Sequence, residues 1–179
     1  STFHSFCANL LRFEIDGFLG YTKNFTIYDS SDQVTLMKSC LKELNLDDKQ
    51  FPPRTVLGTV SSAKNALLRA DEFAKSADDF YTLKVSEAYT LYEKKLKDNN
   101  AVDFDDLLLL AVKLLQERQD IREKYQERFR YILVDEYQDT NKAQYLLTQI
   151  LAAKWRNICV VGDADQSIYA WRGADIQNI

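Results

Sequence analysis

Tyr131-Ile-Leu-Val-Asp-Glu136 and Ile158-Cys-Val-Val-Gly-Asp163 are the two stretches of sequence that decide the fold. Each opens with a short, continuous apolar run containing β-branched residues, which is typical of strands buried on both faces of a parallel sheet. Residues 141–153 between them follow a helical pattern and are long enough for a crossover connection. Strand, helix and strand in this order predict a βαβ unit, and therefore an α/β fold for this part of the chain.

The residues before this unit follow helical patterns, with apolar side chains recurring three and four positions apart. An all-helical block is therefore predicted to precede the α/β block. Its expected elements are a helix over residues 1–13, a second that starts with a capping box at Ser30 and Gln33 and is ended by Pro52 and Pro53, a third over residues 55–97, and a fourth capped by Asp103.

Composition limits the class of protein. The chain has 179 residues, 46% of them hydrophobic, enough for one core or for one core with a small satellite domain. Its net charge of -4 excludes a surface that binds nucleic acid everywhere but leaves room for a local DNA groove. The three cysteines lack zinc-site spacing and are expected to be reduced. No apolar run approaches the roughly 20 residues that span a bilayer, and no signal peptide is recognisable, so we expect a cytoplasmic protein.

Carboxylates follow directly after the first predicted strand. Asp135 and Glu136 lie where ligands bind in open α/β folds, at the carboxyl end of a parallel strand. One such acid can hold Mg²⁺ through water, and its neighbour can activate an attacking water. The alternative is that the pair begins a turn and caps the next helix. The second strand delivers Asp163, Asp165 and Gln166 to the same edge, which favours the first interpretation.

The residues after the second strand combine a polar sensor with a stacking surface. Gln166 carries a donor and an acceptor suited to a γ-phosphate or its water, although a turn residue would look the same. Tyr169, Trp171 and Arg172 offer flat rings for bases and a cation for a phosphate. Aromatic residues belong more often to a core than to a ligand site, but Trp171 stands among small and charged residues, which indicates exposure.

Two kinds of site are excluded within these residues. His4 is the only histidine, so neither a histidine-based triad nor a multi-histidine metal site can form, and His4 taken alone is expected to be structural. None of the five glycines is followed by Lys and then Ser or Thr, so the 179 residues contain no phosphate-binding P-loop.

The strand-end segments together resemble a known family. Residues 131–141 and 161–175 resemble motifs II and III of superfamily 1 DNA helicases of the UvrD/Rep/PcrA branch. Ser1-Thr-Phe-His-Ser5 resembles motif Ib of that family, and Asp103-Phe-Asp-Asp-Leu-Leu108 is similar to the segment that precedes motif II. Residues 24–29 and 58–65 are also similar to the PcrA form found in Gram-positive bacteria. The resemblance covers essentially the whole chain, from motif Ib to motif III.

The resemblance implies Mg²⁺ and ATP as cofactors and DNA as partner, with a role for individual residues. Asp135 would coordinate Mg²⁺, Glu136 would activate the hydrolytic water and Gln166 would sense the γ-phosphate. Single-stranded DNA would meet the rings of Phe104, Tyr169 and Trp171, while Arg172, His4 and Thr2 would lie near the strand or couple it to the nucleotide. Lys64 and Asn65 would contact duplex DNA in single-strand/duplex junctions.

The resemblance also implies a domain organisation, namely a partial RecA-like parallel sheet of the P-loop NTPase class with an inserted all-helical subdomain. Residues 1–20 and 101–179 would form two parts of RecA-like domain 1A, and residues 21–100 would form helical subdomain 1B. We expect the chain to be a piece of a longer protein, in which the Walker A motif precedes Ser1 and a second RecA-like domain with an arginine finger follows Ile179. The piece alone is then expected to be inactive.

The leading hypothesis is an ATP-dependent helicase that moves 3′ to 5′ on single-stranded DNA and unwinds duplexes in DNA repair or replication. A second hypothesis is a DNA-binding or partner-binding module centred on the helical block, which would bind DNA without ATP. A third treats Asp135, Glu136, Asp163 and Asp165 as a two-metal nuclease cluster. The same helicase core could also belong to a subunit of a recombination nuclease.

Overall fold

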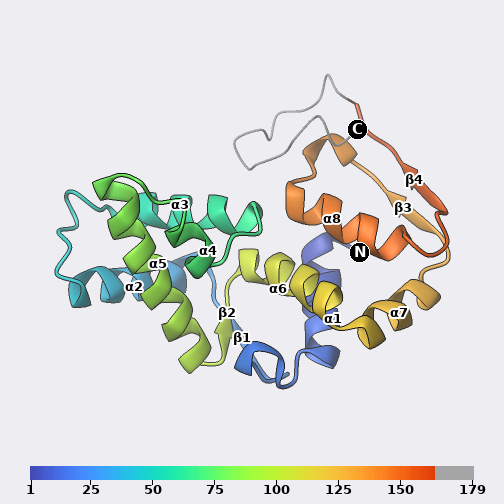
Figure 1. Cartoon of the computed structure of the whole chain (residues 1–179), viewed down its shortest axis with the longest axis horizontal. Coiled ribbons are helices and arrows are strands. Elements are labelled where there is room, and N and C mark those ends of the chain that lie inside the picture. Colours follow the sequence, from blue (N-terminus) through green and yellow to red (C-terminus); the bar gives the residue numbers. More distant parts are fainter. Residues whose placement is uncertain (164–179) are drawn as a thin grey trace.

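The computed structural model describes residues 1–163, which form two lobes lying side by side with α6 (Phe104–Glu117) between them (Figure 1). Two-residue strands lie where the lobes meet, and none of the described helices is long and apolar enough to cross a membrane. The lobe that we call the sheet lobe contains α1 (Phe3–Glu14), α7 (Gln119–Arg128), β3 (Ile132–Val134), α8 (Lys142–Ala152) and β4 (Ile158–Val160). The helical lobe contains α2 (Ser30–Glu43), α3 (Pro53–Asn65), α4 (Ala70–Ala74) and α5 (Phe80–Asp98).

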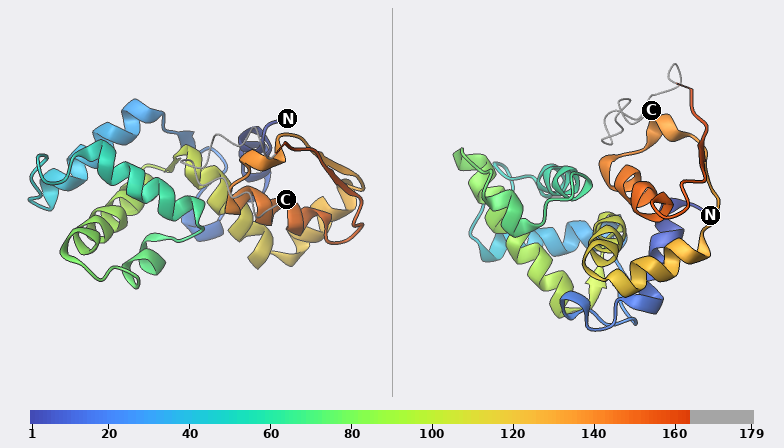
Figure 2. Two further views of the ribbon diagram at one scale, coloured as in Figure 1. Left: turned by 90° about the horizontal axis from the view of Figure 1, so that it is seen from above. Right: turned by 45° about the vertical axis from the view of Figure 1, so that its right-hand side comes forward.

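Helix α6 forms the centre of the molecule. Its N-cap is Asp103, as the sequence predicts, and the cap is a reciprocal capping box with Asp106. The helix packs against α1, α7 and α8 on one side and against α3 on the other (Figure 2). Leu107, Leu110 and Leu114 are all buried, and so are the leucines between them, because neighbouring helices surround the middle of α6.

The helical lobe has its own hydrophobic cluster, built from residues between Met37 and Ala101. The expected single helix over residues 55–97 is wrong: the structure divides it into α3, α4 and α5. Leu67 adopts a positive φ of 66° after α3, and Asp79 starts α5 with a capping box, so local backbone and capping chemistry override the helical periodicity.

The boundaries of α2 and α3 also differ from expectation. The N-cap of α2 is Asp29, whose capping partner is Asp32, rather than Ser30 with Gln33. The proline pair does not end α2, which ends at Glu43; Pro53 is instead the first residue of α3. The reason is that proline lacks an N–H, a group that would remain unpaired in the first helical turn anyway.

Short strands that the sequence did not reveal connect the lobes. β1 (Thr26–Ile27) and β2 (Ala101–Val102) pair in parallel, with Thr26 opposite Ala101. Asn100 adds two hydrogen bonds beside them, since its side chain donates to Thr22 Oγ1 at 2.7 Å and accepts from the Thr22 N–H at 2.9 Å. The chain therefore enters and leaves the helical lobe through neighbouring strands.

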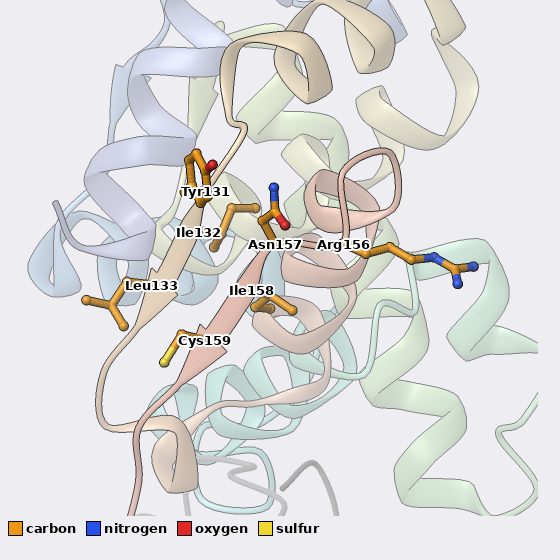
Figure 3. Close-up of a pocket in the computed structure, with 7 residues that line it drawn as sticks. All are labelled: Tyr131, Ile132, Leu133, Arg156, Asn157, Ile158 and Cys159. Carbon is orange, nitrogen blue, oxygen red and sulfur yellow. The ribbon is translucent and has the colours of Figure 1, made fainter.

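The predicted βαβ unit is confirmed. β3 and β4 pair in parallel with Ile132 opposite Ile158, and α8 connects them from its N-cap Asn141. The expectation that both faces of these strands are buried is wrong for the described residues. Leu133 is 72% exposed and Tyr131 81%, while Val134 is buried, because the helices of the sheet lobe cover only one face of β3. All three residues of β4 are exposed. Leu133 and Cys159 lie on the open side (Figure 3).

Candidate nucleotide and DNA site

The acidic pair lies at the carboxyl end of β3, where the backbone turns sharply. Glu136 has the left-handed conformation, with φ 54° and ψ 41°, and a short 3-10 turn (Tyr137–Asp139) follows it. Asp135 Oδ1 accepts the Glu136 N–H at 3.0 Å, and both carboxylates are exposed to solvent. A non-glycine residue in this backbone region is uncommon and strained, which is typical of functional turns.

Gln138 holds this turn in place, and the sequence reading did not select it. Its side chain is 1% exposed. Its Nε2 donates to Glu136 Oε2 at 2.7 Å, and its Oε1 accepts the Asp163 N–H at 3.0 Å. One buried amide therefore fixes one oxygen of the Glu136 carboxylate and the chain that leaves β4, while the other carboxylate oxygen remains on the solvent side.

The end of β4 packs directly on the same turn. Val161 donates its N–H to Val134 O at 2.8 Å, and Tyr137 donates to Val161 O at 2.9 Å. A Cβ on Gly162 would come within 2.8 Å of Gln138 Oε1, so only glycine allows this approach without displacement. The two strand ends therefore meet, as parallel strands should.

The carboxylate oxygens at this edge suit a hard cation such as Mg²⁺, but they are few, so most of its ligands would be waters or phosphate oxygens. Within the described part of the chain, Asp135 Oδ2 accepts no hydrogen bond, which leaves it available for Mg²⁺ or a water of its shell. Asp139 Oδ1 is buried and has no hydrogen-bond partner there either. Over residues 1–163 no three His, Cys, Asp or Glu side chains gather into a metal site, so these residues do not supply a multi-carboxylate cage. Asp165 of the nuclease hypothesis lies outside the described residues.

His4 and Phe104, expected at the DNA from two separate segments, are neighbours. Their rings meet edge to face with centroids 6.2 Å apart, and Phe104 is 48% exposed at the first turn of α6. Burial lowers the pKa of His4, and the negative charge of Asp105 opposes that effect. Thr2 is the N-cap of α1, where its Oγ1 accepts the Ser5 N–H at 3.2 Å. Gln166, Tyr169, Trp171 and Arg172 lie outside the described residues.

Lys64 requires a correction, because it is not placed to contact DNA. Its side chain is 1% exposed, and its Nζ lies 2.7 Å from both Asp103 Oδ2 and Asp106 Oδ1. The Tyr92 hydroxyl donates to the same Asp103 oxygen at 3.1 Å. A lysine between two buried carboxylates serves as an internal counter-ion, a role that its local sequence does not reveal.

The pKa values in this buried cluster follow from burial and from its excess of negative charge. Burial, and next the charge of Asp103, raise the pKa of Asp106 to about 7, although Lys64 opposes the shift. Burial alone would lower the pKa of Lys64, but the two carboxylates outweigh it and hold that pKa well above its usual value. Lys64 therefore stays protonated, and Asp106 is the group whose ionisation the fold disfavours.

Asn65 is also engaged inside the protein. Its Nδ2 donates to Ser61 O at 2.9 Å and to Asp105 Oδ1 at 3.1 Å, and its Oδ1 accepts from Asn141 Nδ2. These hydrogen bonds give the amide protein partners for its donors and its acceptor, and the expectation that Asn65 contacts duplex DNA stays a prediction. A capping asparagine such as Asn141 can be found from sequence, but its bond to Asn65 cannot.

A shallow hollow lies on the sheet, but not at the acidic pair. Tyr131, Leu133 and Cys159 help to line it, together with Asn157 and Arg156 (Figure 3). These residues belong to the beginnings and middles of β3 and β4, away from Asp135. The hollow therefore does not include Asp135 or Glu136.

The chain matches known proteins over its whole length. The family model described as "UvrD/REP helicase N-terminal domain" matches residues 1–179. Three similar relatives, each named ATP-dependent DNA helicase PcrA, come from Bacillus subtilis (strain 168), Leuconostoc citreum and Staphylococcus aureus (strain Mu50 / ATCC 700699) and are 54%, 50% and 49% identical over all 179 residues.

These matches cover 100% of this chain but 24% of each relative, so the chain spans about a quarter of their length. The family model describes the matched region as an N-terminal domain, and not as a segment from motif Ib to motif III. By a family model that covers every residue, the chain belongs to the UvrD/REP helicase family.

Proposed function

We propose that this chain is part of the motor of an ATP-dependent DNA helicase, in which the acidic pair after β3 serves ATP hydrolysis. The observation that carries the proposal is the strained Glu136, held by buried Gln138 at the meeting point of two parallel strand ends. The PcrA name of relatives about 50% identical over the whole chain supports the same reaction.

The roles of the acids follow from their geometry. Asp135, with one carboxylate oxygen unused by the described residues, would hold Mg²⁺ or its hydration water. Bound Mg²⁺ would neutralise charge on the phosphates of ATP. Glu136, with one oxygen fixed by Gln138, would use the other to orient and deprotonate the attacking water. Gln166 is proposed as the group that senses the γ-phosphate.

The DNA track is proposed to run past α1 and α6. The exposed ring of Phe104 beside His4 is suited to stack on a base, and stacking surfaces bind single strands of any sequence. Thr2, Tyr169, Trp171 and Arg172 are proposed to complete this track. Movement 3′ to 5′, strand separation at junctions, and a part in repair or replication in the cytoplasm belong to the same proposal.

A division into subdomains is proposed with it. Residues 1–20 and 101–179 would belong to a RecA-like domain, and residues 21–100 to an inserted helical subdomain. The separate hydrophobic clusters of the two lobes and the paired strands β1 and β2 at their junction support this division.

A matched pair of variants tests the proposal in the intact protein. Glu136→Gln removes the base but keeps the size and the acceptor for Gln138, so kcat for ATP should fall about a hundredfold or more. The dissociation constant for Mg-ATP should change far less. Glu117→Gln, an exposed exchange at the end of α6, should behave like wild type. Equal kcat in the two variants would contradict the assignment.

DNA binding that is indifferent to ATP would instead favour the binding-module hypothesis. The measurement is the affinity for an oligothymidylate and for a tailed duplex, with and without Mg-ATP, alongside strand separation with a 3′ or a 5′ tail. The helicase proposal requires ATP-dependent separation of the 3′-tailed substrate. Metal-dependent cleavage without ATP would support the nuclease alternative.

A further inference from the structure

Asn65 is the one residue of α3 whose side chain bridges α6 and the start of α8 by hydrogen bonds. It is the last residue of α3, in the helical lobe. Its amide nitrogen reaches Asp105 Oδ1 at 3.1 Å, in the first turn of α6, and its oxygen accepts from Asn141 Nδ2, at the start of α8. These contacts join positions 40 and 76 residues away along the chain.

Each end of this bridge leads to a different part of the proposed motor. Asp105 follows Phe104, the exposed ring that contacts His4. Asn141 is the N-cap of α8, accepts the Gln144 N–H at 3.0 Å, and follows the turn in which Gln138 holds Glu136. Thr140 Oγ1 ties Asn141 to that turn by donating to Tyr137 O at 2.7 Å.

The bridge can transmit a displacement because it uses a donor and an acceptor of one planar group. If the first turn of α6 moves when a base contacts Phe104, the Asn65 nitrogen follows Asp105 and the Asn65 oxygen turns with it. The hydrogen bond to Asn141 then shifts the start of α8 relative to the Glu136 turn. Asp would lack the donor and Leu both functions, so the bridge depends on a side-chain amide.

We propose that Asn65 is a positioning residue that couples DNA contact at Phe104 to the hydrolytic turn at Glu136, through its hydrogen bonds to Asp105 and Asn141. The inference rests on the proposed function of both ends. It assigns Asn65 an internal role and no contact with DNA.

The sharpest variants change Asn141, because its cap can be kept while its bond to Asn65 is lost. Asn141→Asp and Asn141→Ser both retain an oxygen that caps α8, since Asp, Ser and Asn are comparable N-caps. Neither retains the amide donor for Asn65 Oδ1. Asn24→Asp, at an exposed position, is the control for the added charge. Urea unfolding verifies that each variant keeps its stability.

The first readout is the linkage between ligands in the intact protein. The affinity for a labelled oligothymidylate is measured with and without a non-hydrolysable Mg-ATP analogue, and the ratio is the coupling factor, commonly about 5- to 150-fold. Both Asn141 variants should bring this ratio to within about twofold of 1, with Asn24→Asp matching wild type. An unchanged ratio in both Asn141 variants would overturn the inference.

The second readout needs no ATP. Binding of the oligothymidylate should slow amide hydrogen exchange at residues 137–144 in wild type, and this protection should disappear in the Asn141 variants while protection at residues 104–108 remains. Protection at residues 137–144 that persists in the variants would refute the coupling. A wild type that binds DNA but hydrolyses no ATP would defeat the proposed function, and the exchange comparison would still decide the inference.

Discussion

The buried amide of Gln138 donates a hydrogen bond from Nε2 to Glu136 Oε2, at 2.7 Å, while its Oε1 accepts the Asp163 N–H at 3.0 Å. Glu136 therefore does not depend on its own rotamer alone for its orientation. The Oε1 atom of Gln138 is bonded to the chain that leaves β4. A displacement of that chain would therefore move the Gln138 amide and, with it, the Glu136 carboxylate.

Gln138→Met should reduce turnover without weakening nucleotide binding. Methionine has a similar size but neither donates nor accepts the two bonds, so Glu136 loses its alignment and kcat should fall about tenfold or more. KM for ATP should change less than about threefold. In the background of Glu136→Gln the same change should add little, because both act on one group. Additive losses of kcat in the double variant would mean that Gln138 does not act through Glu136. Gln50→Met, at an exposed position, is the control.

Phe104→Ala should weaken binding of single-stranded DNA. Loss of one base-stacking ring should cost about 1–3 kcal/mol of binding free energy, which raises Kd roughly 5- to 150-fold. Fluorescence anisotropy with a labelled oligothymidylate measures Kd. Phe80→Ala is a close control, since Phe80 is also exposed at the first position of a helix preceded by a capping aspartate. Equal effects of the two substitutions would remove Phe104 from the DNA track.

Lys64→Met should destabilise the fold. The substitution leaves the buried carboxylates of Asp103 and Asp106 without their counter-ion, and breaking a buried ion pair from one side costs about 3–5 kcal/mol of the free energy of unfolding. Urea denaturation followed by circular dichroism measures the change. Lys38→Met, in the exposed face of α2, should stay within about 0.5 kcal/mol of wild type. A similar small effect for Lys64→Met would show that the cluster is not buried in solution.

Stability should fall as pH rises toward about 7 and level off above it, and Asp106→Asn should reduce that fall. The folded-state pKa of Asp106 is raised to about 7, so from pH 5 up to about pH 7 the unfolded chain has already released this proton while the folded chain retains it, and above about pH 7 both states release it. The stabilisation is complete below the unfolded pKa and is lost as pH rises, with a contribution of about 2–3 kcal/mol across that window. Lys64, Asp103, Tyr89 and Tyr92 surround the group.

Urea midpoints at pH 5 and pH 8 test this prediction. The lowered pKa of His4 acts in the opposite sense, because a neutral buried histidine loses stability as pH falls, and it is the same in both proteins. The quantity to compare is therefore the change in urea midpoint between pH 5 and pH 8, in wild type and in Asp106→Asn. Identical pH dependence would show that Asp106 does not titrate in this range.

Local chemistry fixed the parts of the fold that could be foreseen. Asp103 caps the helix that it was expected to cap, since an N-cap bonds N–H groups two or three residues away. The β3–α8–β4 unit was equally predictable from two apolar runs and the length between them. Pro52 and Pro53 were misinterpreted because proline both ends helices and begins them, and spacing alone does not separate the two uses.

The acidic pair was found because two adjacent carboxylates after an apolar run form a local pattern. Gln138 was missed because its importance comes from burial and from Asp163, 25 residues away. Lys64 and Asn65 were assigned to DNA from the family resemblance, and a charged or amide side chain most often lies on the surface, so nothing in the local sequence opposed that assignment. Only the packing of α3 on α6 reveals that their partners are Asp103, Asp106, Asp105 and Asn141.

The sequence by itself therefore determined the family, the parallel unit and the position of the acidic pair, since each is recorded in residues that are neighbours along the chain. The tertiary structure alone decided which polar side chains face inward and which remain free for ligands. The physical reason is that a buried charge or amide is stable only when its partner is brought to it. For Lys64 and Asn65 those partners lie on helices that follow after 39 to 76 further residues.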